Sequence, residues 1–86
     1  MRREFYSEEE LINGAVDACQ NSGFKGLLIV RNPGDNRVGR LRRRFIQRTN
    51  GRFDVQSVTP EEYERGRLNN HHTLLMHQIT YSNTPH

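Results

Sequence analysis

The chain has little of what builds a large core or a redox centre. It contains one cysteine, no tryptophan and only 33% hydrophobic residues. A single cysteine excludes an intramolecular disulfide and a cysteine-based zinc cluster. Cys19 lies at helical spacing among apolar residues, so we expect a small buried hydrophobe. At 86 residues we expect one compact domain over 1–81, followed by a flexible tail at 82–86.

Long hydrophobic runs are also missing. The longest uninterrupted apolar run is Leu27 to Val30, whereas a transmembrane helix needs roughly 20 residues. We therefore expect no membrane partner and, by default, a cytoplasmic location. Gly34 and Gly39 lack the Gly-Lys-Ser/Thr continuation of a phosphate loop. No cofactor is expected.

Lysine is scarce and arginine takes its place. The chain has one lysine and twelve arginines, and no acidic residue occurs from Asn36 to Phe53. Guanidinium is planar, permanently charged and well matched to phosphate and carboxylate groups. The feature points to an anionic partner. Seven arginines make up this cluster: Arg37, Arg40, Arg42, Arg43, Arg44, Arg48 and Arg52.

The clearest local signal is a helix over about 7–22. Ser7 and Glu10 have the spacing of a capping box, and apolar residues then recur every three or four positions. We expect this helix to end at Ser22-Gly23. The apolar run at 24–31 that follows is too short for a buried helix, so it predicts a strand covered on both faces.

The basic segment at 36–50 has two interpretations. As a helix capped by Asp35 or Asn36, it places Val38, Leu41 and Phe45 on one face. As part of a hairpin over 38–58, it would turn at Asn50-Gly51. We favour the helix, in which Asn50-Gly51 is a left-handed C-cap.

Three further elements complete the order α-β-α-β-α-β. Phe53 to Val58 predicts a strand, Thr59-Pro60 begins a short helix reaching Leu68, and Thr73 to Tyr81 predicts a last strand. The fold class is therefore α/β or α+β, a three-stranded sheet packed by helices. The strands at 27–30 and 53–58, joined by a helix, would form a parallel crossover. In the hairpin alternative the domain is α+β with a meander.

On the helical interpretation most of the cluster lies on the arc opposite the apolar face. Arg37, Arg40, Arg43, Arg44 and Arg48 would carry binding, with Arg42 and Arg52 secondary. The partner would be DNA or RNA, contacted through its phosphates. Docking on an acidic protein is the first alternative. A third interpretation is a solvated face paired internally with acidic residues at Glu61, Glu62 and Glu64.

Four histidines form the second group: His71, His72, His77 and His86. His71 and His77 would lie roughly 20 Å apart along a strand. We therefore expect no metal site. General acid–base use of His71, His72 or His77 in RNA cleavage is chemically feasible, which makes a small ribonuclease the second alternative.

These patterns favour a non-enzymatic, nucleic-acid-binding accessory or regulatory protein. Its thin core would gain from homo-oligomer formation.

Overall fold

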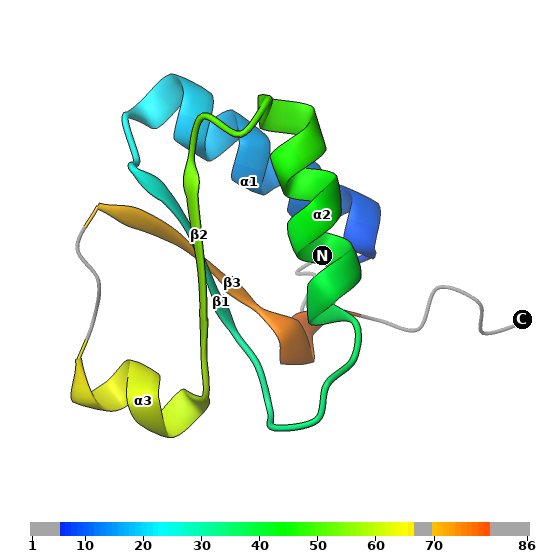
Figure 1. Ribbon diagram of the computed structural model, residues 1–86, viewed down its shortest axis with the longest axis vertical. Helices are drawn as coiled ribbons and strands as arrows, with labels where there is room; N and C mark the ends of the chain where they lie inside the picture. Colours follow the sequence, from blue (N-terminus) through cyan, green and yellow to red (C-terminus); the bar gives the residue numbers. More distant parts are fainter. Residues whose placement is uncertain (1–5, 67–69, 80–86) are drawn as a thin grey trace, which may run out of the picture.

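A computed structural model describes residues 6–66 and 70–79 of this chain. The residues share one small α+β domain in the order expected from sequence, α-β-α-β-α-β (Figure 1). The elements are α1 (Glu8–Ser22), β1 (Gly26–Val30), α2 (Val38–Thr49), β2 (Asp54–Val58), α3 (Pro60–Arg65), β3 (His71–Leu75) and the short 3-10 helix η1 (Met76–Gln78). The expected tail at 82–86 lies outside the described residues, as does His86.

α1 forms as its sequence predicts. The Ser7 hydroxyl accepts from the Glu10 amide at 3.1 Å, and the Glu10 carboxylate accepts from the Ser7 amide at 3.0 Å. This capping box satisfies two amides at the helix start. The helix ends at Gly23, whose φ of 76° is left-handed. Cys19 lies on the buried face, as expected for a small hydrophobe.

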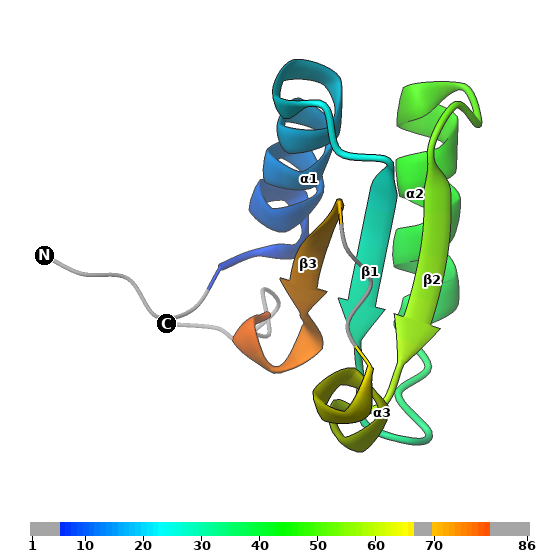
Figure 2. The same ribbon diagram turned by 90° about the vertical axis from the view of Figure 1, so that its left-hand side faces the viewer.

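The sheet has strand order β2-β1-β3, and both pairs are parallel. All five residues of β1 are buried, because β1 is central and is covered on both faces (Figure 2). The expected parallel crossover from β1 through α2 to β2 is confirmed. β2 and β3 are therefore the two edges of the sheet.

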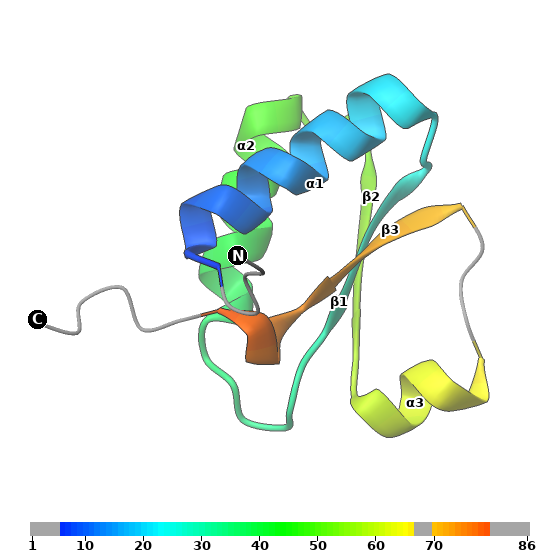
Figure 3. The same cartoon turned by 180° about the vertical axis from the view of Figure 1, so that it is seen from behind.

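The helices lie on opposite faces of this sheet. α1 and α2 cover one face, with α1 over β3 and α2 over β2, and α3 lies on the other face (Figure 2, Figure 3). The crossovers β1–α2–β2 and β2–α3–β3 move across the sheet in opposite directions. When two such crossovers have the same hand, their helices lie on opposite faces. The main core lies under α1 and α2 and includes Ile12, Leu27, Ile29, Phe45 and Leu74.

The hairpin alternative at 38–58 is wrong. α2 is a helix that ends at Asn50 and Gly51, with φ of 56° and 70°. Leu41 and Phe45 are almost fully buried, so tertiary packing of the helical face overrides the hairpin signal of Asn-Gly. Asp35 and Asn36 are not the N-cap, a position that Arg37 takes.

The last strand is shorter than expected. β3 ends at Leu75, and Met76–Gln78 turns into η1, which buries Met76 in the core. Tyr81 lies outside the described residues. α3 begins with a capping box between Thr59 and Glu62, as the sequence indicates. It ends at Arg65, because Gly66 is extended, so the helix does not continue to Leu68 as expected. No helix among the described residues is long and apolar enough to cross a membrane.

Candidate functional site

The arginine cluster lies mainly on α2, and the inner face of that helix fixes its orientation. Leu41, Phe45 and Thr49 are no more than 1% exposed. The Thr49 hydroxyl donates to the Phe45 carbonyl at 2.9 Å, so this polar group is satisfied inside the core. The remaining positions of α2 divide between a flank toward α1 and a flank away from it.

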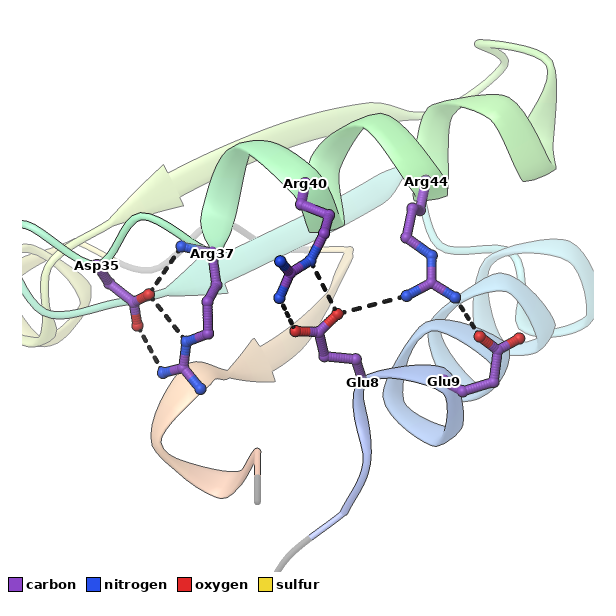
Figure 4. A network of polar contacts seen from close by, with 6 residues as sticks. All are labelled: Glu8, Glu9, Asp35, Arg37, Arg40 and Arg44. Atoms are coloured by element: carbon purple, nitrogen blue, oxygen red, sulfur yellow. Dashed lines mark hydrogen bonds and ion pairs between the residues drawn. The ribbon is translucent and has the colours of Figure 1, made fainter. Parts of the chain in front are cut away.

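The flank toward α1 carries three arginines at four-residue spacing, Arg40, Arg44 and Arg48. They meet the acidic first turn of α1, and Figure 4 shows this for Arg40 and Arg44. Arg40 donates to both carboxylate oxygens of Glu8, and Arg44 lies between Glu8, at 3.4 Å, and Glu9. The contact from Arg48 to Glu9 is 3.6 Å. Each of these arginines thus has a carboxylate partner within the chain.

The arginine side of these pairs is open to water, whereas the Glu8 side chain is only 18% exposed. The side chains of Arg40, Arg44 and Arg48 are 55%, 36% and 42% exposed. The Glu8 carboxylate raises the pKa of Arg40. Exposed ion pairs of this kind are weak. A phosphate could therefore displace Glu8 and Glu9.

The internal partners differ from those considered from sequence. All three of those residues, Glu61, Glu62 and Glu64, belong to α3. This helix lies on the face of the sheet opposite α1 and α2. Within the described part of the chain, every ion pair of α2 goes to Glu8 or Glu9. The sequence signal for these partners is the acidic run Glu8-Glu9-Glu10 at the start of α1.

The flank away from α1 makes no ion pair within the described part of the chain. We call Gly39, Arg42, Arg43 and Ile46 the outer flank of α2; they follow one another at three- and four-residue spacing. Arg42 and Arg43 are exposed, and among the described residues neither makes an ion pair or a side-chain hydrogen bond. Ile46 is the exposed large hydrophobic residue of the described chain, at 36%.

The two ends of the cluster differ. Arg37 donates to the carboxylate of Asp35 at 3.0 and 2.8 Å, which holds the pKa of Asp35 below its usual value. The Asp35 carboxylate therefore offsets the positive charge of Arg37. Arg52 follows the end of α2, is exposed, and donates through Nε to the Thr49 carbonyl at 3.3 Å.

The loop from Asn32 to Arg37 lines a shallow hollow at the carboxyl end of β1. Ligands of open α/β sheets gather at such an end. Here the Asp35 carboxylate accepts from the Arg37 amide at 3.0 Å, and its negative charge opposes an incoming anion. The hollow therefore adds nothing to the arginine surface.

The histidines do not converge. His71 lies 3.3 Å from Asp54 on the face of the sheet away from α1 and α2. His72 has the opposite orientation and stacks edge-on against Phe24 at 5.8 Å, and burial lowers its pKa. His77 is exposed in η1. Residues 6–66 and 70–79 contain no group of three metal-ligating side chains.

We compared the chain with protein families, curated proteins and solved structures. No family model, no curated protein and no solved structure matches the chain.

Proposed function

We propose that this protein binds the phosphate backbone of nucleic acid through α2. The observation that carries the proposal is the imbalance of charge on this helix. Five arginines belong to α2, and their ion pairs within the described chain go to two carboxylates, those of Glu8 and Glu9. The surplus lies on an exposed helix, where phosphates can reach it.

We rank the arginines for phosphate binding by how far carboxylates within the chain offset their charge. Arg42 and Arg43 come first, because they give up no carboxylate when a phosphate arrives. Arg40, Arg44 and Arg48 come second, since phosphate must compete with Glu8 and Glu9. Arg52 adds a cation at the end of the helix. Arg37 contributes least, because Asp35 holds it through two hydrogen bonds.

A duplex backbone fits this surface better than unstacked bases do. Single-strand binding uses exposed aromatic rings among the basic residues. Phe45 is buried and Phe53 packs against the core, and no aromatic residue occurs on the outer flank. A helix of 12 residues spans about 18 Å, long enough to follow several phosphates of one strand.

The test is a titration of a short DNA duplex and an RNA duplex at two salt concentrations. We expect binding that weakens steeply with salt. The double variant Arg42→Gln/Arg43→Gln should bind more weakly and lower the slope of log K against log salt by about 1–2. The matched control is Arg65→Gln, which removes an exposed arginine from α3. Absence of binding to both duplexes at low salt contradicts the proposal.

An acidic protein partner is the second candidate. The observation in its favour is the exposure of Ile46 beside Arg42 and Arg43, since an apolar side chain gains nothing from a phosphate backbone. Interfaces between proteins combine arginine with apolar anchors.

A further inference from the structure

The two edges of the sheet are not equivalent. Beyond the end of β3, the Tyr6 amide donates to the Gln78 carbonyl at 2.8 Å, and Tyr6 pairs with Ile79 in a parallel bridge. The chain therefore pairs with the segment that follows β3, at Gln78 and Ile79. Nothing comparable lies against β2 among the described residues. Among residues 6–66 and 70–79, the outer side of β2 is thus an open edge.

The backbone contacts show which groups of β2 are available. The Asp54 amide donates to the Lys25 carbonyl at 3.2 Å, and the Val58 carbonyl accepts from the Arg31 amide at 2.9 Å. Asp54, Gln56 and Val58 thus direct their backbone groups at β1. Alternate residues of a strand point the other way, so Val55 and Ser57 direct theirs outward. In the described chain these groups have no backbone partner, and the Val55 amide donates to the neighbouring Asp54 carboxylate.

β2 also lacks the features that usually protect an edge. Natural edges carry proline, lysine or a bulge. The sequence Asp54–Val58 contains neither residue, and its register against β1 runs without interruption. Asp54, the charged residue of β2, is engaged by Gln56 and His71.

The outer flank of α2 lies along this edge. α2 covers β2, and α1 lies on the far side of α2 (Figure 2). The flank away from α1 is therefore on the same side of α2 as the outer side of β2, and by helical position it includes Arg42 and Ile46. A strand added there would direct every second side chain at this flank.

We propose that the open edge of β2 takes up an extended acidic segment of a partner protein, which adds as a fourth strand. Its backbone pairs with Val55 and Ser57, and its carboxylates on the α2 side meet Arg42 and Arg43. An apolar side chain in the same row packs on Ile46. This is β-strand addition with specificity from alternate side chains. It goes beyond the proposed function, because nucleic acid cannot pair with a strand edge.

A second copy of this chain is a poorer occupant. Pairing of two β2 edges would bring two outer flanks together, each with Arg42 and Arg43, and like charges across an interface oppose association. An acidic segment removes this repulsion. The charge of the flank thus selects the partner.

The probe is a synthetic, fluorescently labelled peptide of alternating glutamate and valine. Its matched control has lysine in place of each glutamate. We expect the acidic peptide to raise the anisotropy signal in a saturable manner, with protection from hydrogen exchange at the amides of Val55 and Ser57. Equal binding of both peptides, or binding without protection at these amides, overturns the proposal.

Two variants separate the contribution of backbone pairing at β2 from that of the Arg42 charge. Ser57→Pro removes an outward amide without removing a bond to β1, and should weaken peptide binding about tenfold or more. Arg42→Glu should weaken it by a similar factor while leaving the edge intact, so the test survives if Ser57→Pro fails to fold. Arg65→Glu is the matched charge control. Unchanged affinity in a folded Arg42→Glu protein contradicts the proposal.

Self-association and nucleic acid are distinguished in the same experiments. Sedimentation without peptide should show a monomer; a dimer that Ser57→Pro dissociates would assign the edge to a second copy and overturn the proposal. Folded Ser57→Pro should bind the duplex as wild type does. A loss of duplex binding in Arg42→Gln/Arg43→Gln therefore tests the proposed function, and the Ser57→Pro result tests the strand edge.

Discussion

His71 Nε2 lies 3.3 Å from Asp54 Oδ2, although the two residues belong to opposite edges of the sheet. Strands at the two edges are separated by about 9–10 Å. Both residues pair in register with Gly26 of the central strand. Because Gly26 has no side chain, the carboxylate and the imidazole meet over it.

Gly26→Ala should therefore be costly. A Cβ at this position would lie 2.2 Å from the Asp54 carbonyl oxygen and 2.8 Å from its carbon, both backbone atoms. The strands must shift, and we expect a loss of about 1–3 kcal/mol in the free energy of unfolding, measured in urea. Gly39→Ala is the control, since its Cβ meets nothing within 4 Å. Equal stability of the two variants would show that β1 and β2 do not approach so closely.

Asp54 should contribute to the pH dependence of stability. The hydrogen bond from Gln56, and then the one from His71, lower the pKa of Asp54. A lowered native pKa stabilises the fold above the unfolded value of about 3.9, and this contribution is lost as pH falls through the native pKa. The carboxylate is exposed, so Asp54→Asn should cost less than about 1 kcal/mol at pH 7.

The check is to compare urea denaturation of Asp54→Asn with that of wild type between pH 7 and pH 2. The difference should be constant near neutrality and vanish at the acidic end. Asp17→Asn is the control, because the Asp17 side chain is exposed and makes no hydrogen bond or ion pair in the described chain. A difference that grows toward low pH would contradict the assignment.

The sequence predicts the elements of this fold better than their contacts. Ser7, Glu10 and the apolar spacing of 7–22 predict α1 because capping and periodicity are local. Asn50-Gly51 is ambiguous, since the same left-handed backbone ends a helix or turns a hairpin. The end of β3 was missed because the burial of Met76 in η1 depends on tertiary packing.

The contacts of the candidate site depend on how distant elements meet. Arg40, Arg44 and Arg48 form a row in the sequence, but the pairing of this row with Glu8 and Glu9 follows from the packing of α1 against α2. The meeting of Asp54 and His71 likewise requires the strand order β2-β1-β3, which no local pattern contains.

Two glycines of α1 offer a matched pair of stability changes. Gly14 lies inside the helix, and a Cβ there meets nothing within 4 Å. Gly14→Ala should raise the free energy of unfolding by about 0.5–1 kcal/mol. Gly23 ends the helix with a φ of 76°, so Gly23→Ala should lower it by about 1–2 kcal/mol. Thermal melts should move in opposite directions, and a shift of the same sign in both would contradict the positions of these residues in α1.

Removing the carboxylates that hold α2 should separate stability from binding. Glu8→Gln/Glu9→Gln abolishes the ion pairs of Arg40, Arg44 and Arg48. We expect a loss of about 1–2 kcal/mol in unfolding free energy at low salt, which shrinks as salt screens the wild-type pairs.

If α2 binds phosphates, the same variant should bind the DNA duplex more tightly and with a steeper salt slope, because three guanidinium groups lose their internal competitor. Glu61→Gln is the control, since Glu61 lies in the first turn of α3 and makes no ion pair in the described chain. Destabilisation without any gain in duplex affinity would mean that the α1 flank of α2 is purely structural, and would limit the binding surface to the outer flank.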